Sequence, residues 1–175
     1  MTRHKIRCLT SMINKISMDK EVRENYKAYL ERKKLYKSFG YDVDKERDFI
    51  LEEAMPISGK ILEAGTGKGH FALTLAKKGY SFITFDISEE EQSFARLNIA
   101  YSGLEKQVVF RIEDAEHTRF ADASFDVIFS VNVLHHLVNP YKVIDELFRI
   151  LTPDGKLIIS DFSKKGFSVM DKIHA

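Results

Sequence analysis

The chain has very little cysteine. Its 175 residues include only Cys8, which excludes a disulfide framework within the chain and a cysteine-rich zinc site. A domain of this length buries roughly 70% of the surface of its unfolded chain, so its core needs no such covalent or metal support. We therefore expect one domain with a substantial core, no metal site, and a reducing, cytoplasmic location.

Long apolar runs are absent as well. No stretch of about 18 apolar residues occurs, although a membrane-spanning helix requires one. Residues 1–15 lack the apolar core of a signal peptide. The sequence therefore predicts neither a membrane span nor a secretion signal.

A net charge of one sign is also lacking, but the formal value of +1 conceals a split. Residues 1–40 hold eleven basic and four acidic side chains, a net of +7, whereas the other 135 residues hold 16 basic and 22 acidic ones, a net of −6. Such asymmetry can indicate an anionic partner, or simply a solvated helix face. No aromatic residue is interleaved with Arg3, Arg7 or Lys15 to stack on bases, so a nucleic-acid partner is an alternative that the pattern does not favour.

From Lys60 onward, apolar strand-like segments alternate with segments of helical period. The predicted strands are 61–64, 81–85, 108–112, 125–131 and 156–162, and the predicted helices begin at His70, Ser88 and Asn139. This alternation predicts an α/β fold with a three-layer, doubly wound, mostly parallel sheet. Functional residues should then follow the carboxyl ends of the strands.

Three further helical features are predicted. Residues 44–55 form a helix that ends before Pro56, and residues 19–38 form a longer one. In the helix after Ser88, the apolar spacing predicts a buried face made of Phe94, Leu97 and Tyr101.

The most informative segment is Glu63-Ala64-Gly65-Thr66-Gly67-Lys68-Gly69-His70, between a predicted strand and a predicted helix. Alternate glycines let a backbone turn tightly and approach a ligand. The spacing is wrong for a P-loop, and a dinucleotide fingerprint would need a small residue where His70 stands. A tight turn without any ligand is the remaining structural alternative.

The pattern acid-x-G-x-G-x-G resembles the first motif of the class I S-adenosylmethionine (SAM) dependent methyltransferases. The resemblance covers roughly residues 57–162. It implies a Rossmann-like methyltransferase fold that binds SAM and releases S-adenosylhomocysteine. The residues that it places at the cofactor are Glu63, Gly65, Thr66, Gly67, Gly69, Asp86, Ile87, Asp114, Ala115 and Asn132.

Asp86 and Asp114 have the clearest chemistry among these. A carboxylate at the end of the second strand can accept hydrogen bonds from both ribose hydroxyls, although Asp86 alone could equally stabilise the next helix through its dipole. In the family, an acidic side chain and a backbone N–H after the third strand contact adenine, which matches Asp114-Ala115.

The segment after the fourth strand bears on the acceptor. Asn132-Val133-Leu134-His135 replaces the [DNS]-P-P-[YFW] motif of amino-group methyltransferases and resembles the ubiquinone/menaquinone branch. That resemblance implies a small-molecule acceptor. Asn139-Pro140-Tyr141 comes too late in the chain and fits a helix start. His135 and His136 are candidate catalytic bases, or alternatively a loop-packing and an exposed histidine.

The predicted organisation is a basic helical segment, residues 1–43, that could act as a lid, followed by a SAM-binding domain, residues 44–175. Only thirteen residues follow Phe162, so the last two strands of the family fold should be shortened or missing. An open fifth-strand edge favours association, which predicts a homodimer or a covering partner. The alternative functions are an RNA or protein methyltransferase that docks through residues 1–40, and a non-catalytic SAM-binding subunit.

Overall fold

The computed structural model describes residues 20, 23–164 and 166–168. The chain divides into two compact units, Met1–Asp42 and Val43–Ala175. In the first unit, residues 23–38 are helical, and the Lys37 ammonium lies 2.9 Å from the Asp42 carboxylate. The basic residues before Lys20 lie outside the described residues. The lid role of this unit stays a prediction.

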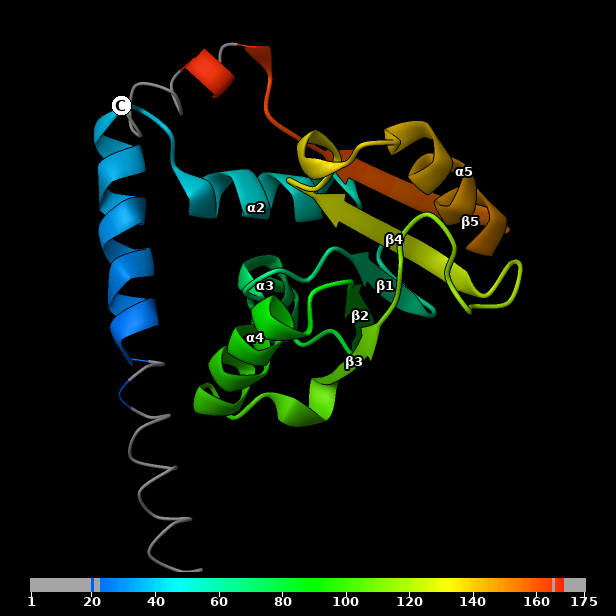
Figure 1. The fold of residues 1–175 in the computed structure, drawn as a ribbon, viewed down its shortest axis with the longest axis horizontal. Coiled ribbons are helices and arrows are strands. Elements are labelled where there is room, and N and C mark those ends of the chain that lie inside the picture. Colours follow the sequence, from blue (N-terminus) through cyan, green and yellow to red (C-terminus); the bar gives the residue numbers. More distant parts are fainter. Residues whose placement is uncertain (1–19, 21–22, 165, 169–175) are drawn as a thin grey trace, which may run out of the picture. The chain divides into compact units, whose positions relative to one another are not determined.

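The second unit is built on a five-stranded sheet in the order β3-β2-β1-β4-β5, and all its strand pairs are parallel (Figure 1). The strands are β1 (Ile61–Ala64), β2 (Phe82–Asp86), β3 (Val108–Ile112), β4 (Phe125–Val131) and β5 (Leu151–Ser160). The helices are α2 (Val43–Glu53), α3 (His70–Lys77), α4 (Glu89–Tyr101) and α5 (Pro140–Ile150), with short 3₁₀ helices η1 (Glu105–Gln107) and η2 (Leu134–His136). The predicted α/β class is confirmed.

The fifth strand begins earlier than predicted. Leu151 already pairs with Phe125, directly after α5, and Lys156 pairs with Val127. Because five residues of β5 match two of β4, residues 152–155 bulge out of the register. Within the described part of the chain, β5 pairs with β4 alone, and the predicted partner for its outer edge stays a prediction.

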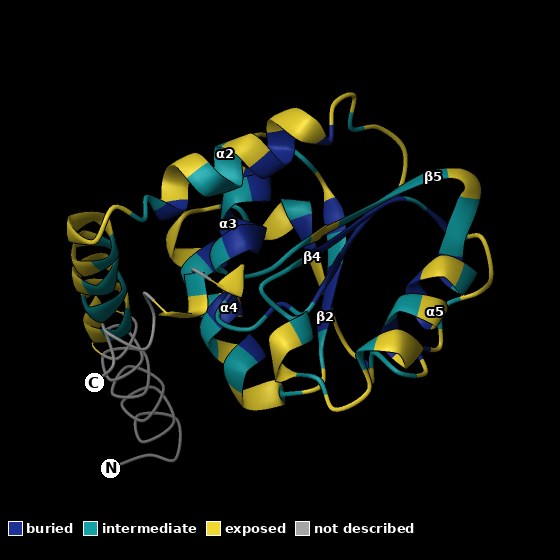
Figure 2. Ribbon diagram, turned by 90° about the horizontal axis from the view of Figure 1, so that it is seen from above, coloured by how far each residue is buried: buried dark blue, intermediate teal, exposed yellow. Residues whose placement is uncertain are grey.

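Two apolar clusters cover the two faces of the sheet. Helices α2, α3 and α4 pack on one face, and α5 packs on the other (Figure 2). On the α5 side, Val143, Leu147 and Ile150 contact the buried strand residues Leu62 and Ile128. Burial on both faces explains the nearly continuous apolar character of β4. No described helix is long and apolar enough to cross a membrane.

The predicted buried face of α4 is wrong. The helix buries Gln92, Ala95 and Ile99, whereas Tyr101 is 66% exposed. The spacing of apolar residues predicted the wrong buried face because a polar side chain, Gln92, faces the core. Its amide donates to the Arg111 carbonyl over 2.8 Å. This hydrogen bond satisfies a buried amide that would otherwise be costly.

A buried carboxylate ties the loop after β3 to α5. Glu146 Oε1 accepts hydrogen bonds from both the backbone N–H and the hydroxyl of Thr118, each over 2.7 Å. Arg149, one turn further along α5, bonds to Glu146 and donates to the Phe120 carbonyl over 2.9 Å. The hydrogen bond from Arg149 lowers the pKa of Glu146 to about 2. The loop that follows β3 is thereby fixed against the helix.

Glu146→Gln should lower the free energy of unfolding by roughly 1–3 kcal/mol at pH 7, because it leaves buried donors and the guanidinium poorly matched. Since the folded pKa is depressed, the contribution of Glu146 is present above its ordinary pKa of 4.5 and disappears as the pH falls toward 2. Urea unfolding at pH 7 and pH 3 measures this, with the exposed Glu105→Gln as control. An equal gap between parent and Glu146→Gln at both pH values would contradict the assignment.

Candidate functional site

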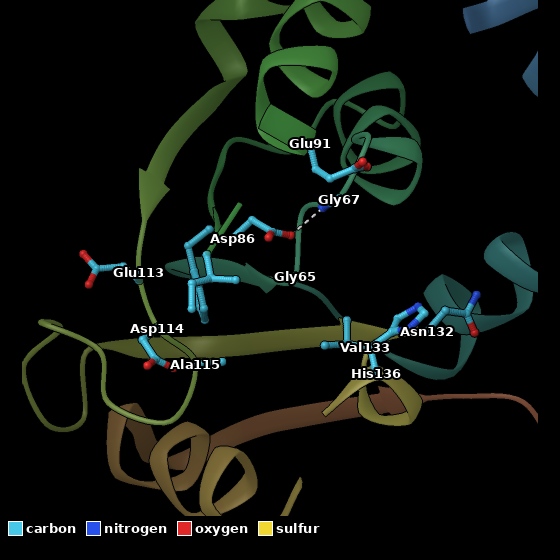
Figure 3. A pocket seen from close by; sticks show the side chains of 12 residues that line it. Gly65, Gly67, Asp86, Glu91, Glu113, Asp114, Ala115, Asn132, Val133 and His136 are labelled. Atoms are coloured by element: carbon cyan, nitrogen blue, oxygen red, sulfur yellow. Dashed lines mark hydrogen bonds between the residues drawn. The ribbon is translucent and has the colours of Figure 1, made fainter. Parts of the chain in front are cut away.

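A cavity of about 380 Å³ lies at the carboxyl ends of the strands, beside the point where the sheet order reverses between β1 and β4 (Figure 3). This is where open α/β sheets bind ligands, and the volume suits a small molecule. It is lined by Gly65, Gly67, Phe85, Asp86, Ile87, Glu91, Glu113, Asp114, Ala115, Asn132, Val133 and His136.

The glycine loop between β1 and α3 is fixed to the end of β2. The backbone N–H groups of Gly65 and Thr66 both donate to the Phe85 carbonyl over 2.9 Å. The Gly67 N–H donates to Asp86 Oδ2 over 2.7 Å, the dashed line in Figure 3. These bonds satisfy three backbone donors of the loop and hold it at the wall of the cavity.

The three glycines of the loop have different neighbours. A Cβ on Gly65 would overlap the Val133 side chain, and a Cβ on Gly69 would lie 2.7 Å from Ala95 Cβ. A Cβ on Gly67 would meet nothing within 4 Å. The sequence predicted a close approach to a ligand at all three positions. At Gly65 and Gly69 the close neighbour is another part of the protein.

Asp86 is the central carboxylate of the cavity. Its Oδ2 accepts from Gly67, and its Oδ1 accepts from the Ser88 N–H over 2.9 Å. Each carboxylate oxygen can accept a second hydrogen bond, so both keep capacity for a ligand hydroxyl. Ser88 is the N-cap of α4, and its hydroxyl accepts from the Glu91 N–H over 3.2 Å. Asp86 thus lies at the cavity and also beside the start of α4, so the ribose contact and the helix-dipole alternative both stay predictions.

A series of buried, hydrogen-bonded side chains lies behind the glycine loop. Thr84 donates its hydroxyl to Glu63 over 2.6 Å, Thr66 lies 2.6 Å from the Thr84 hydroxyl, and the Gln92 amide donates to Thr66 over 3.3 Å. Glu63 is 2% exposed, and burial raises its pKa to about 8. Glu63 and Thr66 therefore lie behind the glycine loop and do not line the cavity.

The acidic residues after β3 form one end of the cavity. Asp114 Oδ1 accepts from the Glu116 N–H over 2.9 Å, which holds the turn that carries Ala115. The neighbouring Glu113 bonds to Arg119 Nε over 3.0 Å, and this hydrogen bond lowers the pKa of Glu113. An ionised pair therefore stabilises the backbone beside Asp114.

The segment after β4 forms the other end. Asn132 has φ = +57°, a conformation that asparagine tolerates better than most residues, and its N–H donates to the Ser160 carbonyl over 2.8 Å. Its Oδ1 is buried and has no hydrogen-bond partner among the residues that the structure describes. A buried acceptor without a partner at a cavity is a candidate ligand contact.

The two histidines differ in their surroundings. His136 lines the cavity, whereas His135 does not. His135 Nδ1 lies 2.7 Å from Asp161 Oδ1, and its backbone N–H donates to Asp161 Oδ2 over 3.0 Å. The two imidazole rings lie 3.8 Å apart between centroids. Sequence reasoning missed Asp161 because it placed this residue inside the predicted strand 156–162, whereas β5 ends at Ser160.

The cavity therefore brings together eight of the predicted residues: Gly65, Gly67, Asp86, Ile87, Asp114, Ala115, Asn132 and His136. Glu63, Thr66, Gly69 and His135 lie outside its lining. Four lining residues were not predicted, namely Phe85, Glu91, Glu113 and Val133. Three of them are each next to a predicted residue in the sequence, and the fourth, Glu91, lies in the first turn of α4, shortly after the end of β2. The only sequence signal for these positions was their nearness to the ends of strands.

Comparison with known proteins gives the family. The family model described as "Methyltransferase domain" matches residues 62–159, more than half of the chain. The chain therefore belongs to the class I SAM-dependent methyltransferases. The predicted resemblance and the predicted Rossmann-like fold are both confirmed.

The individual relatives share about a third of their aligned residues with this chain, or fewer. The chain is 34% identical over 119 residues to methyltransferase GfsG from Streptomyces halstedii, covering 66% of this chain and 43% of that protein. It is 27% identical to the ubiquinone/menaquinone biosynthesis C-methyltransferase UbiE of Geotalea daltonii, covering 78% and 60%. A solved SAM-dependent methyltransferase from Aquifex aeolicus shares 28% identity and a TM-score of 0.60, covering 67% and 64%. The chain thus spans about half the length of the curated relatives that it matches.

Gly69→Ala should be more destabilising than Gly79→Ala. Both glycines have positive φ, 77° and 90°, but only Gly69 has a close neighbour where the Cβ would lie. Left-handed backbone costs a non-glycine residue about 1–2 kcal/mol, and overlap with α4 should add roughly 1–3 kcal/mol at Gly69. Urea unfolding of both variants measures the difference. An equal decrease in the free energy of unfolding in the two variants would show that α4 moves to accommodate the extra methyl group.

Glu63→Gln should change how stability depends on pH. Because the folded pKa is raised from 4.5 to about 8, parent stability falls as the pH rises through this range, by at most roughly 1.4 kcal/mol per pH unit. Glutamine does not titrate and still accepts from Thr84. Urea unfolding at pH 5.5 and 8.5 should therefore show the variant gaining on the parent at the higher pH. If the free energy of unfolding falls by the same amount in parent and variant between pH 5.5 and 8.5, Glu63 is not a buried carboxyl group with a raised pKa.

Proposed function

We propose that this chain binds SAM in the cavity and transfers its methyl group to a small-molecule acceptor. The observation that carries the proposal is Asp86, a carboxylate positioned by two backbone N–H groups at the wall of the cavity. Both of its oxygens keep hydrogen-bonding capacity, as recognition of two ribose hydroxyls requires. Family membership supports the same cofactor.

The rest of the cavity fits the other parts of SAM. At one end, Asp114 and the Ala115 backbone offer an acceptor and a donor for the adenine edge, beside the apolar Ile87. At the other end, the unpartnered Oδ1 of Asn132 is an acceptor suited to the ammonium group of the methionine tail. Gly67 leaves open space at the turn between these ends. The residues present therefore fit the cofactor.

SAM supplies a methyl group already activated on a sulfonium sulfur. The chain's own task is then to align the acceptor with that methyl group, exclude water, and remove a proton where the acceptor carries one. His136, in the cavity wall, and His135, next to it in η2, are the candidate groups for the last task.

A small-molecule acceptor is favoured by the segment after β4 and by the relatives. The [DNS]-P-P-[YFW] motif is absent, and two similar proteins are described as ubiquinone/menaquinone biosynthesis C-methyltransferases. An RNA or protein acceptor, and SAM binding without catalysis, are the outcomes against which this proposal is tested. Binding to RNA would fall steeply with salt.

Asp86→Asn should weaken SAM binding by roughly 10–100-fold, because it removes the charge from a hydrogen bond worth about 1.5–3 kcal/mol. Isothermal titration calorimetry with SAM measures the affinity, and thermal unfolding verifies that the variant is folded. The matched control is Asp145→Asn, the same change on the exposed face of α5. A folded Asp86→Asn variant with the parent's affinity would refute the proposed ribose contact.

A further inference from the structure

Gln92 places a fully buried amide on α4. Its side chain is 0% exposed, and it stands on the face of the helix that also buries Ala95 and Ile99. Burying an amide is costly unless its polar atoms are hydrogen-bonded, and an apolar side chain is the ordinary choice at such a position. The contribution of Gln92 must therefore lie in the hydrogen bonds that it makes.

These hydrogen bonds fix the orientation of the amide. Arg96, one turn further along α4, donates from Nη2 to Gln92 Oε1 over 3.0 Å. A guanidinium group has no acceptor, so the atom that faces Arg96 is the amide oxygen. The NH₂ group donates to the Thr66 hydroxyl over 3.3 Å and to the Arg111 carbonyl over 2.8 Å. Both hydrogens of the amide are thereby used.

The two acceptors of the NH₂ group belong to different walls of the cavity. Thr66 is part of the glycine loop, between the lining residues Gly65 and Gly67. Arg111 is in β3, shortly before the lining residue Glu113. One side chain on α4 therefore joins the glycine loop to the strand that leads into the end of the cavity proposed to hold adenine.

This link crosses β2, which lies between β1 and β3 in the sheet. Each wall is bonded to β2 through its backbone: the Thr66 N–H donates to the Phe85 carbonyl over 2.9 Å, and the Glu113 N–H donates to the Asp86 carbonyl over 3.2 Å. The Gln92 side chain adds a direct cross-link between the two walls. Because a cross-link limits the relative movement of the groups that it joins, the separation of the walls depends on the amide.

The Thr66 end of the cross-link is held from a second side. Thr84 donates its hydroxyl hydrogen to Glu63, so Thr66 must supply the hydrogen in its own bond with Thr84. The bonds therefore run in one direction, from Gln92 through Thr66 and Thr84 to Glu63. Loss of the amide would remove the first donor of this series and leave the Thr66 oxygen without it.

We propose that Gln92 is a positioning residue of the SAM site, and that its amide holds the glycine loop and the end of β3 at the separation that the adenosyl group requires. This rests on the proposed function. A site that is already ordered before binding loses less free energy when the ligand binds. SAM affinity therefore depends on a side chain that does not itself line the cavity.

The first test is Gln92→Met, because methionine has a similar length and volume but no amide group. Calorimetry with SAM and with S-adenosylhomocysteine should give dissociation constants roughly 10-fold above those of the parent, as expected when bonds that hold the site are lost. The matched control is Ile99→Ala, which truncates a fully buried side chain about two turns further along α4. This control should unfold at a lower temperature than the parent and bind both ligands within threefold of the parent.

The second test compares ligands of different length, which separates positioning of the two walls from damage to one of them. Methylthioadenosine carries the ribose and the adenine and reaches both walls, whereas adenine reaches one. In Gln92→Met, the dissociation constant of methylthioadenosine should rise roughly 10-fold, and that of adenine, from NMR titration, should stay within twofold of the parent. An equal loss for both ligands overturns the positioning role.

The third test is a double-mutant cycle with Thr66→Val, which removes the hydroxyl that accepts from Gln92 and leaves the Arg111 bond in place. Thr66→Val should weaken the binding of S-adenosylhomocysteine, and the double variant should bind better than the product of the two single effects, because both changes remove the same bond. Single effects that multiply overturn the link to the glycine loop. If Gln92→Met does not fold, parent affinity in Thr66→Val overturns this link in its place.

The outcomes also separate the two proposals. A parent chain that binds neither SAM nor S-adenosylhomocysteine refutes the proposed function. Parent affinity in the folded Gln92→Met variant, or an equal loss of affinity in Ile99→Ala, overturns only the role of Gln92 and leaves the cofactor site intact.

Discussion

The site depends on how closely the glycine loop approaches its neighbours. Gly65 contacts Val133 after β4, and Gly69 contacts Ala95 of α4, each at a distance that leaves no room for a Cβ. These two contacts join β1 to β4 and α3 to α4 at one edge of the sheet. The cavity wall is therefore set by backbone packing, and Gly67, between the two contacts, is free to face the cavity.

The two carboxyl groups next to this loop have different roles. Glu63 is buried beneath it, at the end of a hydrogen-bonded chain that reaches Gln92. Asp86 faces the cavity and accepts from the loop itself. The buried chain holds the turn through hydrogen bonds, and the Asp86 oxygens at the cavity keep capacity to accept from hydroxyl groups.

Much of this arrangement could be predicted from the sequence, because strand-helix alternation and the rule of strand ends are local patterns. They place Gly67, Asp86, Asp114 and Asn132 at one edge before any coordinates are known. Other features of the site depend on contacts between elements that are far apart in the sequence, and these could not be predicted. The burial of Gln92 contradicts the apolar period of α4, since its partner, the Arg111 carbonyl, lies on another element. The pairing of His135 with Asp161 spans 26 residues, and no local pattern encodes it.

The central claim is that the cavity holds SAM with its ribose on Asp86. A crystal structure of the chain with S-adenosylhomocysteine tests it most directly. The account predicts both ribose hydroxyls within hydrogen-bonding distance of the Asp86 carboxylate and the adenine beside Asp114 and Ala115. An adenosyl group bound elsewhere on the chain, or in this cavity with Asp86 turned away from the ribose, would contradict it.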